Sequence, residues 1–479
     1  MRIWLKPMIF CESGPGNILY LYHNHFFMEI FEPKQIGKKM FSLMEELYPI
    51  NRSITGNGVR KTLKIFKKII DLKIHEVPSG TQVFDWTVPE EWNIYDAYIK
   101  DSNGEKIIDF KNSNLHVLNY STPINKKMSL DDLKPHLFTL EKYPDAIPYR
   151  TSYYQKNWGF CLTHKQFSEL KNQEYEVVID SKLENGFLTY GEYYIPGKFD
   201  DEILISTYIC HPSMCNDNLS GPVLAATLAE SLKNTSLNYS VRFLFIPETI
   251  GAITWLSLNK NKIQNIKHGL VATCLGDSGI SRYKKSRDGN NKIDYIVEQV
   301  LSESGQPYEI LDFWPSGSDE RQFCSPGFNL PIGSLMRTPY DMFAEYHSSA
   351  DNLSFMNLNC LSDTFQKYYK IIKKLDEDYE NQKPDKKFLM YKKSNSDDPV
   401  YLNLMPYGEP QLGKRGIYDQ IGGVKEQDSL KEKQAVQWIL NLSDGTNSLK
   451  DIEKRSGLEF KILKKISNLL IEKKLLSKV

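Results

Sequence analysis

The chain has 479 residues, of which 41% are hydrophobic and 25% are charged, and its 60 basic residues balance 60 acidic ones. This length exceeds what one hydrophobic core usually supports, so two or three domains are expected, and a net charge of zero argues against a polyanionic partner. No run of 18 apolar residues predicts a membrane-spanning helix, and seven cysteines in a long chain favour reduced thiols, so a cytoplasmic protein without a membrane partner is expected.

The first part of the chain contains three predicted regions. Residues 1–35 are aromatic and polar without a clear period, and we expect them to form an N-terminal extension. From residue 36 to about 74, apolar residues at helical spacing predict two amphipathic helices around a turn. Short alternating runs between Pro, Tyr, Trp and Asn follow, which predicts a β-rich domain inserted at residues 76–175.

Strands alternate with helices in the next part of the chain. Apolar runs predict strands at 202–209, 239–246, 268–276 and 330–337, and helices at 221–234, 292–304 and 358–378. This alternation predicts an α/β domain, built from residues 36–75 and 176–380, in which a mostly parallel sheet carries helices on both faces.

The C-terminal part is expected to be a linker at 381–427 and a winged-helix domain at 428–479. Three short amphipathic helices predict a shared core of Val436, Ile439, Ile452, Leu463, Ile466 and Leu470. The net charge of this domain is only +4, from 11 basic and 7 acidic residues. Because Phe460, Lys461, Lys464 and Lys465 form a modest basic stripe, packing or assembly of a homo-oligomer is favoured over binding of nucleic acid.

Polar side chains follow the predicted strands. His211 and Asp217 come after the first strand, Glu248 after the second, Asp277 after the third, and His347 in the loop after the fourth. Ligands of open α/β sheets bind outside the carboxyl ends of the strands. Two His and two Asp can hold zinc with one position left for water, and Glu248 is placed to take a proton from that water.

Each of these residues also has a purely structural interpretation. A single His is more often hydrogen-bonded in a core than bound to a metal. Glu248 follows a proline and fits a helix N-terminus, and Asp277 in GDSG fits a turn. The shared order of the five residues favours the metal site.

The insertion and the last loop offer candidates for contact with a substrate. SYYQKNWGFC is aromatic enough for core packing, but Arg150, Tyr153, Tyr154 and Lys156 would otherwise form a wall of the substrate site. Tyr346, next to the last His, is placed to donate a hydrogen bond to a developing oxyanion.

The motifs ICHPSMCNDNLSG, FLFIPETIGA and CLGDSG resemble the zinc aminopeptidase family that also includes glutaminyl cyclase. The order there is His, a metal-bridging Asp, a Glu-Glu pair, Asp and His. The resemblance implies a zinc-peptidase-like fold with Asp217 as the bridging ligand, Glu248 as general base, and His211, Asp277 and His347 as further ligands.

Two features bear on the number of metal ions that the resemblance implies. Ser318 and Asp319 match a Ser-Asp pair that follows in the family. Thr249, however, stands where the second Glu would be, which weakens the second metal position unless Glu345 replaces that ligand. One zinc ion is therefore expected, and a second zinc ion is the alternative.

A closer resemblance is to a bacterial subfamily of aminopeptidase-like proteins that carry YPINRSITGNGVR, CHPSMCNDNLSG, GEPQLGKRG and a winged-helix tail. It covers residues from about 40 to 479. Members of this subfamily are often discussed alongside surface-polysaccharide gene clusters.

Three functions follow from these patterns. The first is a zinc amide hydrolase, most simply an aminopeptidase acting on a peptide or a small amide-containing substrate. The second is an amide hydrolase acting on an amino sugar or a polysaccharide precursor. The third is a nucleic-acid-binding regulator whose peptidase-like domain senses a ligand.

Overall fold

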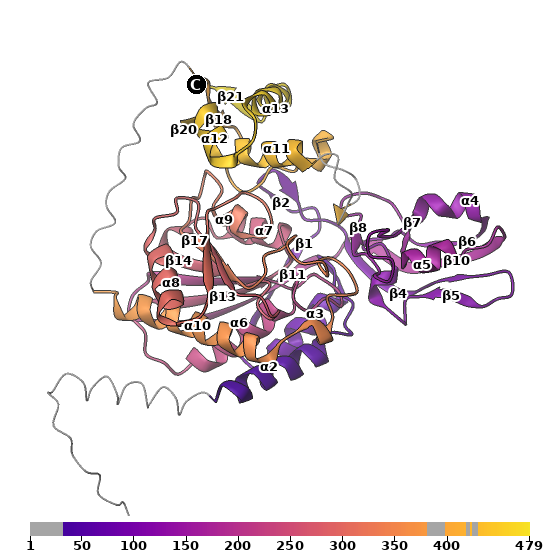
Figure 1. Ribbon diagram of the computed structural model, residues 1–479, viewed down its shortest axis with the longest axis horizontal. Helices are drawn as coiled ribbons and strands as arrows, with labels where there is room; N and C mark the ends of the chain where they lie inside the picture. Colours follow the sequence, from indigo (N-terminus) through magenta and orange to yellow (C-terminus); the bar gives the residue numbers. More distant parts are fainter. Residues whose placement is uncertain (1–31, 381–397, 418–421, 424–429) are drawn as a thin grey trace, which may run out of the picture.

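The computed structural model describes residues 32–380, 398–417, 422–423 and 430–479. Nearly all of the expected N-terminal extension, and a large part of the expected linker, therefore lie outside the described residues. Figure 1 shows an α/β body, a smaller β-rich part that projects from it, and the C-terminal helices above the body, where α11 lies next to the residues that follow α9.

An eight-stranded sheet forms the centre of the body. Its order is β1 (Lys73–Pro78), β11 (Phe187–Ile195), β13 (Ser240–Ile246), β12 (Glu202–Tyr208), β14 (Ile266–Val271), β17 (Ile332–Met336), β15 (Ser281–Lys284) and β16 (Tyr308–Leu311). The strands β13, β12, β14 and β17 are mutually parallel, whereas β1, β11 and β15 join antiparallel neighbours. The expected mostly parallel sheet is confirmed.

Helices cover both faces of this sheet. One face carries α2 (Pro33–Leu47), α3 (Asn57–Phe66), α6 (Ser220–Leu232), α8 (Lys292–Glu303) and α10 (Leu358–Glu377), and the other carries α7 (Ile250–Leu258) and α9 (Glu320–Phe323). Within β12, Ile203 and Ile205 belong to the first core and Leu204 to the second, as the two-residue period of a strand requires. Within the described ranges, no helix has the length and apolar character that crossing a bilayer demands.

The second predicted helix is shorter than its sequence pattern suggests. The helix α3 ends at Phe66, and residues expected to continue it to about 74 turn instead into β1. Pairing of β1 with β11 satisfies the backbone groups of both strands, and this distant partner is invisible in the local pattern.

The inserted region is a four-stranded antiparallel sheet. Its order is β5 (Lys106–Asp109), β4 (Glu91–Lys100), β10 (Glu174–Glu184) and β6 (Ile124–Ser129). Around it lie β2 (Gln82–Val83), β3 (Trp86–Thr87), α4 (Leu130–Leu133), β7 (Leu137–Phe138), β8 (Arg150–Thr151), β9 (Phe160–Cys161) and α5 (His164–Ser168). Because β10 belongs to this sheet, the insertion extends beyond the expected boundary at 175, and the chain returns to the body at β11.

The C-terminal part has the expected winged-helix architecture. It contains α11 (Leu430–Leu442), α12 (Leu449–Ser456), α13 (Phe460–Glu472) and the three-stranded sheet β20 (Asp444–Ser448), β18 (Val400–Asn403), β21 (Leu476–Lys478). All six predicted core residues are buried. The domain was expected to begin at 428, but β18 lies in the range assigned to the linker and pairs with both other strands, so the domain begins earlier. A short strand, β19 (Gly422–Gly423), pairs with β8 of the insertion.

Candidate metal centre

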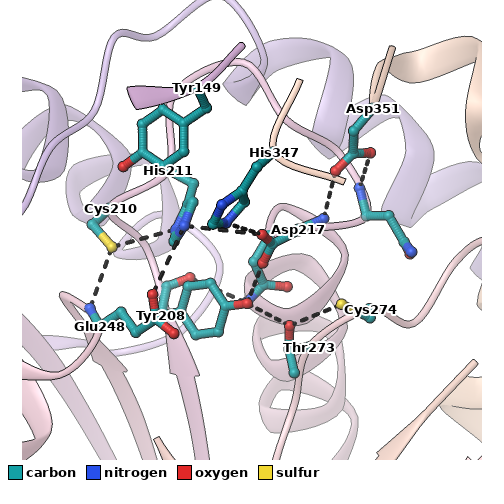
Figure 2. A network of polar contacts seen from close by, with 12 residues as sticks. Tyr149, Tyr208, Cys210, His211, Asp217, Glu248, Thr273, Cys274, His347 and Asp351 are labelled. Carbon is teal, nitrogen blue, oxygen red and sulfur yellow. Dashed lines mark hydrogen bonds and ion pairs between the residues drawn. The ribbon is translucent and has the colours of Figure 1, made fainter. Parts of the chain in front are cut away.

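Three of the predicted ligands meet at the carboxyl ends of the parallel strands (Figure 2). His347 Nε2 lies 2.9 Å from Asp217 Oδ2, and His211 Nε2 lies 4.0 Å from the same oxygen. The possible ligand atoms of the three residues are all within 4.8 Å of one another. Apart from these two imidazoles, no described residue offers a hydrogen-bond donor to the buried Asp217 Oδ2. A buried carboxylate oxygen that faces two imidazole nitrogens fits a zinc ion.

Backbone hydrogen bonds fix the position of Asp217. The carboxylate of Asp351 accepts the N–H groups of Cys215, Asn216 and Asp217 at 3.2, 2.6 and 2.8 Å. Asp351 is fully buried, and burial raises the pKa of its carboxyl to about 7. The peptide bond between Asp217 and Asn218 is cis. Asp351 therefore holds the loop that carries the central carboxylate.

The helix that follows this loop packs unusually close to the sheet. A Cβ atom at Gly221, in the first turn of α6, would lie 2.1 Å from Ala272 O and 2.4 Å from Thr207 Oγ1. Only glycine allows this approach of helix and strand ends. The glycine of NDNLSG thus sets how near Asp217 lies to β12 and β14.

The second oxygen of Asp217 has its own partner. The Tyr208 hydroxyl, at the end of β12, donates a hydrogen bond to Asp217 Oδ1 and lies 2.7 Å from Thr273 Oγ1. Burial raises the pKa of Tyr208 well above 10, so the hydroxyl stays protonated and remains a donor. Oδ1 of Asp217 therefore binds the Tyr208 hydroxyl, and Oδ2 faces the two imidazoles. In metal sites, hydrogen bonds from outer residues such as Tyr208 orient the ligands in this way.

His211 is held as a neutral ring. Burial lowers the pKa of His211 to about 4, and neutral imidazole is the form that binds a metal. The buried guanidinium of Arg52 donates from Nε to His211 O at 2.9 Å, and Cys210 Sγ lies 3.5 Å from His211 Nδ1. Arg52 belongs to the YPINRSITG motif, which explains how a distant segment contributes to the site.

The insertion reaches into the centre through Tyr149. Its backbone N–H donates to His347 O at 2.8 Å, and its ring centroid lies 5.0 Å from that of His211 and 5.3 Å from that of His347. On the other side, the Tyr346 ring stacks on His347 with centroids 3.9 Å apart. Burial raises the pKa of the Tyr346 hydroxyl well above 10, which keeps it a potential donor. Tyr149 therefore contacts both imidazoles, and Tyr346 contacts that of His347.

Glu248 lies beside the three clustered residues. Its Oε2 is 3.8 Å from His211 Nε2, and its side chain is 25% exposed, so substrate and water can reach it. Burial raises the pKa of Glu248 well above its ordinary value, and the carboxylates of Asp319 and Asp217 raise it further. Burial also raises the pKa of Asp319 to about 7. A carboxyl group of raised pKa is suited to taking up and returning a proton.

The structure does not bring Asp277 into this cluster. Its Oδ1 accepts from Thr338 Oγ1 at 2.6 Å and Gly279 N at 2.7 Å, and its Oδ2 accepts from Asn216 Nδ2 and Thr338 N at 3.0 Å. Among the described residues, neither Asp277 nor Glu345 joins a group of possible metal ligands. Thr273, which follows β14, reaches the site instead, because its Oγ1 lies 2.7 Å from the Tyr208 hydroxyl.

The predicted substrate wall is only partly near the centre. Tyr153 OH lies 2.9 Å from Tyr149 OH, which links it to the site. Tyr154 donates to Thr87 O at 3.1 Å, and Lys156 is 79% exposed with its Nζ 3.9 Å from Glu90 Oε2. The Arg150 guanidinium lies over the Phe138 ring at 5.4 Å. These last three contact the insertion or its edge rather than the imidazole pair.

Sequence reasoning missed four residues that shape the site, namely Arg52, Tyr149, Tyr208 and Asp351. Tyr208 lies at the end of a predicted strand, and in that apolar run its hydroxyl does not stand out as a functional group. Asp351 follows His347 by four positions in SSADN, which was a usable signal. Arg52 and Tyr149 lie in segments whose sequence shows no helical or strand periodicity, so no pattern indicated them.

Comparison with known proteins agrees with this architecture. Residues 41–378 match a family model described as a domain of unknown function, DUF4910, and residues 399–478 match a model described as winged helix-turn-helix. A Clostridium acetobutylicum protein, provisionally described as a polysaccharide biosynthesis protein with an aminopeptidase-like domain, is 55% identical over 445 residues. The match covers 93% of this chain and 97% of that protein.

Solved structures extend the comparison to the fold. The crystal structure of a provisionally described peptidase from Clostridium acetobutylicum has a TM-score of 0.72 at 52% identity, with 95% of this chain and 100% of that chain covered. The zinc aminopeptidase BSAP of Bacillus subtilis has a TM-score of 0.53 at 10% identity, with 71% and 94% covered. The expected zinc-aminopeptidase fold with a C-terminal winged helix is thereby confirmed.

Proposed function

We propose that this chain, which belongs to the DUF4910 family and has the fold of a zinc aminopeptidase, is a zinc-dependent hydrolase of amide bonds. His211, Asp217 and His347 hold one zinc ion. The observation that carries the proposal is the buried Oδ2 of Asp217, which lies 2.9 Å from His347 Nε2 and 4.0 Å from His211 Nε2 and has no other donor among the described residues. A buried carboxylate is costly unless a positive charge compensates it, and a zinc ion bound by these three residues would supply that charge.

The residues around this centre account for the steps of hydrolysis. A bound zinc ion supplies a Lewis acid that lowers the pKa of water and polarises a carbonyl group. Glu248 takes one proton from the attacking water and returns it to the amine nitrogen as the C–N bond breaks. Tyr208 holds the Asp217 carboxylate in place, and Tyr149 and Tyr346 restrict the space over the imidazole rings.

A single metal site suits the side chains that are present. Thr249 stands where the resembling family has a second Glu, and its hydroxyl accepts a hydrogen bond from Arg321 Nη2 at 3.2 Å. Asp277 is fully engaged with hydrogen-bond donors. Neither residue therefore offers a strong ligand for a second ion.

A polysaccharide precursor is the second candidate substrate. Two observations favour it: the description of the 55% identical relative names polysaccharide biosynthesis, and the ring of Tyr149, from the insertion, lies beside both imidazoles. Tyrosine faces and hydroxyls suit sugar rings as well as peptide side chains. On this alternative the same residues cleave the amide of an amino sugar.

The test uses the full-length protein loaded with zinc. It is assayed against aminoacyl-coumarin amides, which report N-terminal amide cleavage, and against N-acylated amino sugars, with the Glu248→Gln variant as control. The proposal is supported if the wild-type protein hydrolyses one of these two substrate classes and Glu248→Gln does not. The class that is hydrolysed identifies the type of substrate. A zinc-loaded protein that cleaves neither class contradicts it.

A further inference from the structure

The turn that carries Glu248 is held by residues outside its own strand. Thr249, the next residue, has a φ of +61°, a backbone conformation that β-branched residues rarely adopt. Its N–H donates to Asp319 Oδ1 at 2.7 Å, and its hydroxyl accepts from Arg321 Nη2 at 3.2 Å. The start of α9 therefore fixes the backbone from which Glu248 projects.

Arg321 is itself held by the C-terminal part of the chain. Its Nε lies 3.2 Å from Glu409 Oε2, and the side chains of the two residues are only 17% and 14% exposed. The pair borders a small cleft that is also lined by Gln437 and Asn441 of α11. An ion pair so little exposed is screened less by solvent than a surface pair, so removing one partner matters more.

Glu409 belongs to a segment that packs partly on the winged-helix core and makes several hydrogen bonds to the rest of the chain. We call residues 404–417 the strap. The backbone N–H of Glu409 donates to Gln322 Oε1 at 2.8 Å, and Glu409 O accepts from Trp86 Nε1 at 2.6 Å. Gly408 N donates to Ser325 Oγ at 2.9 Å. Both sides of Glu409 are thus fixed, so its carboxylate is directed at Arg321.

A second anchor lies further along the strap. Asp85, between β2 and β3, accepts hydrogen bonds from Gln411 N at 2.8 Å, Lys414 Nζ at 2.7 Å and Arg415 Nη1 at 2.5 Å. This anchor stabilises the strap without contacting the Glu248 turn. The Asp85 contacts should therefore keep the strap bound to the body even when Glu409 is replaced.

We propose that Glu409 is a positioning residue, which holds Arg321 against Thr249 and so fixes the direction of Glu248. The C-terminal part of the chain then completes the active site of the α/β body. The inference rests on the proposed function in one respect, because it takes Glu248 as the group that moves protons. The contact chain from Glu409 to Thr249 can be tested without that premise.

The first test measures activity in the zinc-loaded, full-length protein. Glu409→Gln keeps the shape of the side chain and removes its charge, and it should lower kcat about tenfold, as loss of an outer positioning partner typically does, with little change in KM. The melting temperature should fall as well, because the ion pair is little exposed. The control is Glu309→Gln, which breaks the more exposed Arg282–Glu309 pair, 2.9 Å long, on the edge strand β16. Equal kcat values for the two variants would overturn the proposal.

A double-mutant cycle asks whether Glu409 acts through Arg321. If it does, the variant with both Arg321→Gln and Glu409→Gln should be no slower than the one with Arg321→Gln alone. Losses that multiply would show that the two residues act independently, which also overturns the proposal.

The second test needs no substrate. Hydrogen exchange of the backbone amides at 248–252 should be faster in Glu409→Gln than in Glu309→Gln, because the Thr249 turn loses the support of Arg321. Unchanged protection there contradicts the proposal, even if the protein cleaves amides. Faster exchange in a protein that cleaves none would reject the hydrolase function and keep the positioning role.

Discussion

Asp217 is the residue on which the candidate metal centre depends. Its Oδ1 accepts a hydrogen bond from Tyr208, and its Oδ2 faces His211 and His347. Burial alone would raise the pKa of Asp217, but His211 and His347 lower it to about 2, so the carboxylate is ionised at neutral pH. A fixed carboxylate beside two imidazole nitrogens supplies the ligand types that zinc prefers.

The contrast between Asp217 and Asp277 gives a direct prediction. Asp217→Asn should lose most of its zinc, because the amide cannot supply the anionic oxygen. Asp277→Asn should keep its zinc, because that carboxylate binds Thr338, Gly279 and Asn216 instead. The measurement is zinc content by elemental analysis after gel filtration. Zinc retained by the first variant and lost by the second would show that the ligand set is wrongly assigned.

Glu248 is predicted to act on protons and to leave the metal bound. Glu248→Gln should keep the fold and one zinc ion, yet hydrolyse amides at least about a hundredfold more slowly, since a general base contributes roughly 10² to 10⁴ in rate. The comparison is kcat and zinc content for both proteins under the same conditions. Loss of zinc from the variant would make Glu248 a ligand.

At the residue scale, the sequence placed polar residues at strand ends most accurately where they follow a strongly buried strand. His211 and Glu248 follow β12 and β13, whose residues are all buried, so the ends of these strands were easy to place. Asp277 was misplaced because β14 ends at Val271, and the chain turns before it reaches the aspartate. Strand ends set by tertiary pairing cannot be located from apolar character alone.

At the scale of elements, one ion pair joins the insertion to the body. Arg60 of α3 binds Glu91 of β4 through Nη1 and Nη2 at 2.7 and 2.5 Å. Hydrogen bonds from Arg60 lower the pKa of Glu91 to about 2. The same carboxylate accepts from Phe187 N at 3.0 Å, where the chain returns to the body. Glu91 therefore ties both crossings of the insertion together.

The pH dependence of this contact has a definite sign. Because the pKa of Glu91 is lower in the folded chain, its stabilising effect is present above the ordinary value of 4.5 and is lost as the pH falls from there toward 2. Glu91→Gln should lower the free energy of unfolding by about 1–2 kcal/mol at pH 7, after allowance for solvent screening.

Urea unfolding of both proteins between pH 7 and pH 3 checks this expectation. The difference between wild type and Glu91→Gln should shrink below pH 4.5. A difference that is constant over this range would mean that the variant disturbs packing rather than charge.

The same scale shows why some elements were missed. Strands β12 and β13 are buried throughout, whereas in β10 the buried residues Tyr175, Val177 and Ile179 alternate with less buried ones. No strand was predicted at β10, and nothing in its local pattern assigns it to the inserted sheet. Its neighbours β4 and β6 lie far away in sequence, so the domain boundary depended on long-range pairing.

At the scale of the whole molecule, the C-terminal part is packed on the body. Arg287 Nη2 lies 2.5 Å from Asp444 Oδ2 and donates to Asn441 O at 3.0 Å. The strap adds the contacts of Glu409 and Asp85. Part of the range that the sequence assigned to a linker therefore bridges the C-terminal part and the body. The sequence could not show this, because the partners lie from about 80 to more than 300 residues away and leave no periodic pattern.

Nucleic-acid binding by the winged helix should be weak. The helix α13 exposes Lys461 and Lys464, but Lys465 is paired with Glu432 at 2.6 Å, and the net charge of residues 428–479 is only +4. We expect dissociation constants of roughly 10⁻⁴ to 10⁻⁶ M for duplex DNA at physiological salt, weakening as salt is added. Titration of a labelled duplex at two salt concentrations is the check, and nanomolar, sequence-selective binding would favour a regulator instead.

The most direct test of the account is an anomalous-scattering map at the zinc edge, from crystals of the zinc-loaded protein. The account predicts one strong peak, about 2.0–2.2 Å from His211 Nε2, Asp217 Oδ2 and His347 Nε2. A map without a peak between these residues, or with its only peak at Asp277, would contradict it.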